Sequence, residues 1–183
     1  MTTRLETPAT IDAAPEVTRP ALEAVKKQLG SVPNLHRVLA SSPATLDAYL
    51  ALGTALNKGT LDPKTRDRLA ITVAEVNGCD YCLSAHTFLG KNLRKLDDAE
   101  LNANRDAASS DPKAQAALRF AAQVVKARGH VTDADVAAVK AAGFTQAQVL
   151  EIVAHTALNT LTNYVNTVAQ TEIDFPVVTH HAR

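Results

Sequence analysis

Apolar residues recur along most of this chain at intervals of three and four, the spacing of one face of an α-helix. The segments between these stretches are short, and they are rich in the residues that begin and end helices. No run of alternating β-branched residues is bounded by hairpin turns, so the pattern contains no convincing strand. We therefore expect an all-α fold, a single-domain helical bundle.

Capping residues mark the starts of the expected helices. Ser42, Asp62 and Asp111 each precede a proline, which is favoured at the first helical position. Thr132 and Thr145 are each followed three residues later by an Asp or a Gln, which resembles a capping box. Left-handed helix ends are expected at Gly30, Gly59, Gly78, Gly129 and Gly143. The expected helices are one closed by Gly30, then 43–57, 63–77, 79–90, 112–128, 133–142 and 146–171.

The domain organisation follows from length and from the first residues. Three prolines punctuate a polar leader, so we expect residues 1–17 to form an arm and residues 18–183 to form one all-α domain. A chain of 183 residues is long enough to bury its own core. The N-terminus has no apolar stretch typical of a secretory signal, and no apolar run reaches membrane-spanning length. We expect a cytoplasmic protein without a membrane partner.

The charge balance bears on the possible partners. Lys plus Arg and Asp plus Glu number 19 each, so no general attraction to nucleic acid or to anionic lipid is built in. The apolar share is 46% and the charged share is 21%, which is ordinary for a globular domain. We therefore expect no nucleic-acid partner.

The last expected helix carries no Asp, Glu, Lys or Arg from Ile152 through Thr171. Two stripes follow its helical period, and the polar one contains His155, Asn159, Asn163 and Asn166. The apolar stripe contains Val149, Ile152, Val153, Leu161, Tyr164, Val165 and Val168. One interpretation places the apolar stripe on the core and the amides in solvent. The other places the amides in a pocket or against another subunit, because uncharged polar groups cost less to bury than ions.

The residues with chemical potential lie in the segment TRDRLAITVAEVNGCDYCLSAHTFLG. Its two cysteines are the only ones in the chain, and in a reducing compartment their close spacing indicates redox or metal chemistry. Gly78 should end one helix and Cys79 should open the next, so Cys79 and Cys82 lie where a helix N-terminus favours a thiolate. Spacings of three and four place both cysteines and His86 on one helix face.

Peroxide reduction needs an attacking thiolate, an acid for the leaving alkoxide and a second thiol that resolves the sulfenic acid. His86 is one helical turn from Cys82 and two turns from Cys79, so we expect Cys82 to be the attacking thiolate. Two carboxylates are candidates to assist. Asp67 should face His86 across the helical hairpin, directly or through water, whereas Glu75 either accepts a proton from Cys79 or is exposed near the helix end.

The stretch NGCDYCLSAH, with a carboxylate twelve residues before its first cysteine, resembles the carboxymuconolactone decarboxylase superfamily in its alkylhydroperoxidase D-like branch. The resemblance covers about residues 40–125, and the ending NTLTNYVNTVAQTEIDFP is similar to that of the peroxidase-related members. It implies an all-α homo-oligomer, commonly a trimer or a hexamer. It also implies a peroxidase without a cofactor that reduces organic hydroperoxides at the expense of an external dithiol.

Carried over by position, the resemblance implies that Cys82 becomes the sulfenic acid and that Cys79 is the proton donor and resolving thiol. His86 is then the relay histidine. The relay carboxylate falls on Asp67, where the family usually has Glu, and the shorter side chain makes its contact with the relay water-mediated or lost. Decarboxylases of the superfamily do not rely on a Cys-x-x-Cys pair, which argues against decarboxylation here.

Other interpretations of these residues remain open. The dithiol also suits a redox sensor or a general disulfide reductase. Zinc is disfavoured because only three ligands are local, and we expect no metal. Tyr81 is a pocket wall, a hydrogen-bond donor or simple packing, while His155, Asn159 and Asn163 belong to a pocket or an interface. The remaining histidines are expected at the surface or at caps; they are His36, His130, His180 and His181.

Overall fold

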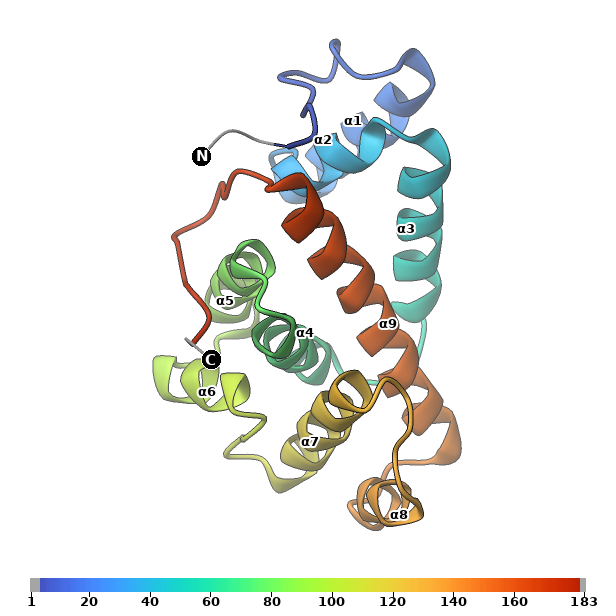
Figure 1. Cartoon of the computed structure of the whole chain (residues 1–183), viewed down its shortest axis with the longest axis vertical. Helices are drawn as coiled ribbons and strands as arrows, with labels where there is room; N and C mark the ends of the chain where they lie inside the picture. The colour runs from blue at the N-terminus through green and yellow to red at the C-terminus, as the bar shows by residue number, and fades with distance from the viewer. Residues whose placement is uncertain (1–3, 182–183) are drawn as a thin grey trace.

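The computed structural model describes residues 4–181, and in this part of the chain nine α-helices and one short 3-10 helix are present without a strand (Figure 1). The all-α prediction is confirmed. In chain order the elements are η1 (Glu16–Thr18), α1 (Arg19–Leu29), α2 (Asn34–Ala40), α3 (Pro43–Leu56), α4 (Pro63–Asn77), α5 (Asp80–Arg94), α6 (Asp98–Arg105), α7 (Pro112–Lys126), α8 (Asp133–Ala141) and α9 (Gln146–Ala169). No helix in residues 4–181 combines the length and the apolar character needed to cross a membrane.

Two helices, α2 and α6, were not predicted. Each is shorter than the window over which a helical period is visible in sequence, and tertiary packing decides such short helices. α5 also continues past Gly90, where the prediction ended it, as far as Arg94. Gly90 is buried there, and a Cβ at this position would lie 3.0 Å from Leu101. The glycine therefore allows α6 to approach α5 closely.

Gly59 does not have the left-handed conformation that the sequence suggested, whereas Gly78 does, with φ of 67°. At Gly59 the requirement is space, because a Cβ would lie 2.8 Å from the carboxyl group of Glu151. That carboxylate accepts hydrogen bonds from the backbone N–H groups of Thr60 and Leu61. The glycine thus lets α9 hold the loop that leads into α4.

Helix α4 is the centre of the fold, since it packs against α5, α6, α7 and α9 (Figure 1). One apolar cluster lies on the side of α2, α3 and α5, and a second lies on the side of α7 and α9. α4 contributes Ile71 to the first cluster and Leu69 and Val73 to the second, all fully buried. The two clusters hold α4 and α5 in the antiparallel hairpin that brings the cysteines beside α9.

Residues 171–181, which we call the C-terminal strap, run back along α5 (Figure 1). Asp174 accepts a hydrogen bond of 2.8 Å from the hydroxyl of Tyr81, and Val178 donates one of 2.8 Å to Ser84. Asp80 accepts bonds from the backbone N–H of His180 at 2.8 Å and from its ring at 2.6 Å. The strap therefore covers the helix that carries the cysteines.

The histidine predictions have mixed outcomes. His130 and His181 are exposed, as expected. His180 is partly exposed, with 36% of its side chain accessible, and its ring lies 2.6 Å from Asp80. His36 is only 9% exposed, and burial lowers its pKa to about 4 against the opposing charge of Asp174, so its surface assignment was wrong.

The segment before η1 packs onto α2. Ala14 is buried, and Arg37 donates hydrogen bonds to the backbone carbonyls of Pro8 and Ala9. Residues 1–3 of the expected arm and residues 182–183 of the expected domain lie outside the described residues.

Candidate functional site

The turn from α4 into α5 places both cysteines at a helix N-terminus. Gly78 ends α4 in the left-handed conformation, and Cys79 is the N-cap of α5. The sulfur of Cys79 accepts a hydrogen bond from the backbone N–H of Cys82 at 3.4 Å. Both thiols are free, and the two residues are 2% and 3% exposed. This local geometry is the one that the glycine and the cysteine spacing predicted.

The polar stripe of α9 faces the cysteines. Asn166 donates a hydrogen bond of 3.2 Å from Nδ2 to the sulfur of Cys82, and Thr162 lies 3.9 Å from the same sulfur. Thr162 donates its hydroxyl hydrogen to the carbonyl of Asn159, so its oxygen is free to accept a hydrogen bond from the thiol. The exposed fractions of His155, Asn159, Asn163 and Asn166 are 5%, 7%, 1% and 3%. The interpretation of this stripe as a solvent face was therefore wrong.

The apolar stripe of α9 is not simply its core face either. Ile152 is fully buried, but Tyr164 and Val168 are 60% and 59% exposed. The face of α9 beside the cysteines carries polar residues. Much of the apolar surface of α9 therefore lies on its outer face, exposed to solvent.

The two thiols have opposite electrostatic environments. A hydrogen bond from Cys79, the nearby His86 and the amides of Asn163 and Asn166 lower the pKa of the Cys82 thiol against the opposing effect of burial. The same bond to Cys82, together with burial, raises the pKa of Cys79. Of the two thiols, that of Cys82 therefore has the lower pKa.

His86 and Asp67 face each other across the α4–α5 hairpin, as expected. Nδ1 of His86 lies 3.7 Å from Oδ1 of Asp67, which is within ion-pair distance but too long for a hydrogen bond. The other carboxylate oxygen lies 2.6 Å from Nε of Arg94. Burial would raise the pKa of Asp67, yet His86 and Arg94 hold it below its ordinary value. Arg94 was missed in the sequence, although it lies two helical turns after His86 on the same face.

Glu75 is positioned away from His86. Its carboxylate lies 2.7 Å from Nε of Arg105 and accepts a bond of 2.7 Å from the backbone N–H of His181. The side chain is 10% exposed, so the interpretation of Glu75 as an exposed residue near a helix end was wrong. Glu75 joins α4 to α6 and to the C-terminal strap.

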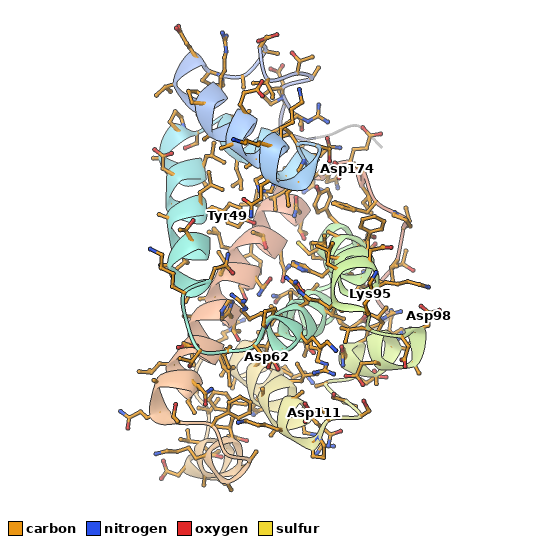
Figure 2. All side chains as sticks on the ribbon, turned by 180° about the vertical axis from the view of Figure 1, so that it is seen from behind. Tyr49, Asp62, Lys95, Asp98, Asp111 and Asp174 are labelled. Atoms are coloured by element: carbon orange, nitrogen blue, oxygen red, sulfur yellow. The ribbon has the colours of Figure 1, made fainter. Side chains whose placement is uncertain are left out.

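Two cavities border the dithiol. The Cys82 cavity, of about 250 Å³, contains Cys82, His86, Asp67, Arg94, His155 and Asn159. The Cys79 cavity, of about 540 Å³, contains Cys79, Asp80, Asn166, Thr167 and residues of the C-terminal strap. Tyr81 borders both, and Tyr49 reaches the first from α3 (Figure 2). The two thiols thus open onto different cavities, and Glu75 lines neither.

Tyr81 separates the two cavities. Its hydroxyl donates to Asp174 at 2.8 Å and accepts a hydrogen bond of 3.0 Å from the backbone N–H of Leu35. Burial raises its pKa, so the phenol stays protonated.

No group of three or more His, Cys, Asp or Glu side chains within residues 4–181 is arranged to hold a metal ion.

Comparison with known proteins agrees with this geometry. Residues 43–123 match the model of the carboxymuconolactone decarboxylase family. An uncharacterized protein of Haemophilus influenzae is 41% identical over 63 residues, which cover 34% of this chain and 50% of that protein. The alignment thus spans half the length of this curated relative.

Solved structures extend the likeness over most of the chain. An uncharacterized peroxidase-related protein from Ralstonia eutropha JMP134, described as an alkylhydroperoxidase AhpD core, has a TM-score of 0.83 at 29% identity, covering 94% of this chain and 92% of its own. A peroxidase-related protein from Silicibacter sp. TM1040 has a TM-score of 0.81 at 26% identity, covering 93% and 91%.

The debrominase Bmp8, solved as a variant with 2,3,4-tribromopyrrole, shares the fold with a TM-score of 0.78 at 18% identity and covers 94% of each chain. Taken together, residues 43–123 match the carboxymuconolactone decarboxylase family, and the all-α fold around the Cys-x-x-Cys pair is similar over most of the chain to the two peroxidase-related structures.

Proposed function

We propose that this protein is a thiol-dependent peroxidase that reduces organic hydroperoxides through a cycle of sulfenic acid and disulfide. The observation that carries the proposal is the asymmetry of the dithiol. Cys82 is held as the more acidic thiol by Cys79 and the amides of α9, and it borders the cavity that contains His86. A stabilised thiolate beside a proton donor is what cleavage of an O–O bond requires.

In the first step the Cys82 thiolate attacks the terminal oxygen of the hydroperoxide. An S–O bond forms, the O–O bond breaks, and the leaving alkoxide takes a proton from His86, so that an alcohol is released. The charge of Asp67, at a separation of 3.7 Å, stabilises the charged form of the imidazole. The distance from this carboxylate to His86 is longer than a hydrogen bond, and its other oxygen is paired with Arg94.

In the second step the sulfur of Cys79 attacks the sulfenic acid on Cys82. The S–S bond forms, the S–O bond breaks, and the proton of the Cys79 thiol leaves with the hydroxyl group as water. An external dithiol then reduces the disulfide by thiol exchange. The lower pKa of Cys82 makes it the better leaving thiolate, so the incoming thiol should attack Cys79.

The test is steady-state turnover of cumene hydroperoxide with a small dithiol donor, with peroxide and thiol both quantified. One peroxide should disappear for every two thiols oxidised, and the oxidised protein should be lighter by two hydrogens. Cys82→Ser should abolish turnover. Cys79→Ser should stop at one sulfenic acid on Cys82, trapped by a dimedone-type probe.

Two results would contradict this scheme. A wild-type protein that oxidises once and then stops would indicate a redox sensor. A trapped sulfenic acid on Cys79 in the Cys82→Ser protein, with Cys79→Ser inert to the probe, would reverse the two roles.

We also propose that the protein is a homo-oligomer that buries the outer face of α9. Leu150, Tyr164 and Val168 are 63%, 60% and 59% exposed, and Val153 and Leu161 on the same helix are 38% and 37% exposed. An apolar stripe of this kind on a surface without ions is typical of a subunit interface. Light scattering should give a mass above that of a monomer, and Tyr164→Lys should lower it. Val17→Lys, at another exposed apolar position, serves as the control and should leave the mass unchanged.

A further inference from the structure

Helix α9 lines the Cys82 cavity from His155 to Thr162. Thr162 marks the end beside the sulfur, and His155 lines the cavity seven residues earlier on the same helix. At 1.5 Å per residue, the two ends are about 10 Å apart. Arg66 and Asn57 also line this cavity. Asp62, labelled in Figure 2, caps the start of α4. Arg66 follows it by one turn of the helix. We call the end formed by Arg66 and His155 the distal end.

Arg66 brings a positive charge to the distal end and forms no ion pair with a carboxylate within the described residues. Its Nη1 donates a hydrogen bond of 2.7 Å to the amide oxygen of Asn57. By contrast, Arg94 in the same cavity is paired with Asp67 at 2.6 Å. The cavity therefore has one guanidinium available for an anion.

His155 supplies a second, independent observation. The residue is 5% exposed, and its Nε2 is buried without a hydrogen-bond partner within residues 4–181. A buried polar atom without a partner is unfavourable, so a ring nitrogen in this position favours a ligand that supplies the missing bond. Burial and the charge of Arg66 lower its pKa against the effect of Glu151, which leaves a neutral ring with one N–H to donate.

We propose that Arg66 and His155 bind a carboxylate group of the substrate, so that the preferred substrates are hydroperoxides of organic acids. A guanidinium binds a carboxylate through two parallel hydrogen bonds, which fixes the orientation of the molecule as well as its charge. The acid group is then anchored at the distal end and the peroxide group reaches Cys82. This inference rests on the proposed peroxidase function, and it names the substrate class for that site.

A binding experiment tests it without turnover. Calorimetry should show that 4-isopropylbenzoate binds the wild-type protein at least tenfold more tightly than the neutral 4-isopropylbenzamide. Arg66→Gln should remove this difference, and Arg66→Lys should retain part of it, because the charge remains while the paired bonds are lost. Lys64→Gln removes one positive charge from an exposed position on the same helix and should keep the difference. Equal affinities in the wild-type protein would overturn the inference.

Kinetics give the second measurement. The 4-carboxy derivative of cumene hydroperoxide should have a kcat/KM at least tenfold above that of cumene hydroperoxide, mostly through KM, and Arg66→Gln should abolish that ratio. Turnover of both peroxides at equal kcat/KM, without selective benzoate binding, would refute the carboxylate site and leave the peroxidase proposal intact. Selective benzoate binding with no peroxide consumption would support the site and refute the peroxidase.

Discussion

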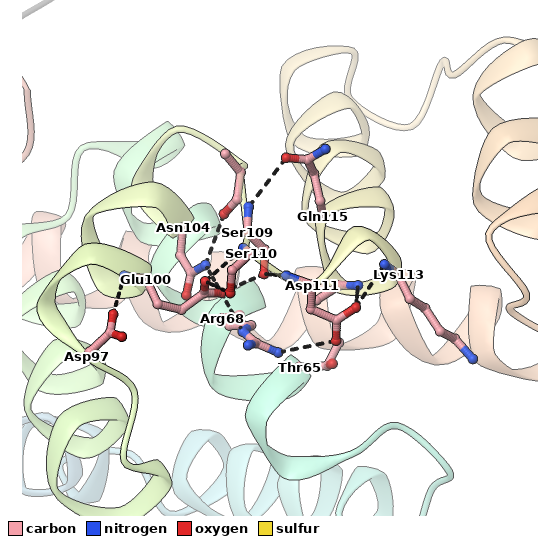
Figure 3. Close-up of polar contacts among 12 residues, drawn as sticks. Thr65, Arg68, Asp97, Glu100, Asn104, Ser109, Ser110, Asp111, Lys113 and Gln115 are labelled. Atoms are coloured by element: carbon pink, nitrogen blue, oxygen red, sulfur yellow. Dashed lines mark hydrogen bonds and ion pairs between the residues drawn. The ribbon is translucent and has the colours of Figure 1, made fainter.

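Two buried charged clusters lie along α4, and they differ in how completely their carboxylates are paired. In the Glu100 cluster, one carboxylate oxygen lies 2.8 Å from Arg68 and accepts bonds from Asn104 and Ser109. The other oxygen accepts two bonds from Ser110 (Figure 3). Although burial would raise the pKa of Glu100, these hydrogen bonds lower it to about 2. This carboxylate has no capacity left for a ligand.

The Cys82 cluster remains open. Nδ1 of His86, Nε2 of His155 and Oδ1 of Asn166 are buried without hydrogen-bond partners in the described part of the chain. Asp67 meets His86 only at 3.7 Å. Buried polar groups are normally paired, and a concentration of unpaired ones around a cavity is expected where a ligand must be accepted. The difference teaches that the closed cluster holds α4, α6 and α7 together, whereas the open one is available for chemistry.

Breaking the closed cluster should have the largest effect on stability. Glu100→Leu leaves Arg68, whose side chain is 10% exposed, without its buried partner, and such a loss costs about 3–5 kcal/mol. Thermal or urea unfolding measures it. Asp98→Asn, which removes a 73% exposed carboxylate from the same helix, should cost less than about 1 kcal/mol. A small effect of Glu100→Leu would show that the cluster is not structural.

The same carboxylate predicts a loss of stability in acid. The pKa of Glu100 is lower in the folded protein than in the unfolded chain, so its contribution is complete above the ordinary value of 4.5 and is lost as the pH falls towards about 2. Unfolding free energies measured from pH 6 to pH 2.5 should fall less steeply in Glu100→Gln than in the wild-type protein. Parallel curves would contradict the assignment.

Altering the open cluster should affect rate more than stability. Asp67→Asn removes the charge that stabilises protonated His86, and because general acid catalysis as a whole contributes about 10²–10⁴-fold, the reaction should slow by at most that factor. Peroxide-dependent sulfenic acid formation should slow, while disulfide formation by a chemical oxidant should not. An unchanged peroxide rate would show that Arg94 has taken Asp67 out of the relay.

The smallest expected effect tests the thiolate itself. Asn166→Ala removes the amide that donates to the Cys82 sulfur, and a hydrogen bond to a charged group is worth about 1.5–3 kcal/mol. The pKa of Cys82 should therefore rise by about 1 to 2 units. The pH dependence of alkylation measures this, since only the thiolate reacts, and the midpoint should move to higher pH. Gln146→Ala, at an exposed position near the start of the same helix and outside both cavities, is the control.

Much of the fold could be predicted from local pattern because capping and helical periodicity act over a few residues. α4 begins and ends where Asp62, Pro63 and Gly78 indicated. Local pattern did not predict the short helices α2 and α6 or the continuation of α5 through Gly90. Long-range packing stabilises these parts of the fold. The strap on α5 also escaped prediction, because hydrogen bonds such as that between Tyr81 and Asp174 join residues far apart in the sequence.

The sequence by itself determined that Cys79, Cys82 and His86 share one helix face at a helix N-terminus, because spacings of three and four have only one outcome in an α-helix. Only the tertiary structure decided what surrounds them. The polar stripe of α9 faces Cys82, and one carboxylate oxygen of Asp67 is paired with Arg94. These contacts depend on which helix faces meet, and that is set by packing the apolar clusters on both sides of α4 rather than by any local spacing.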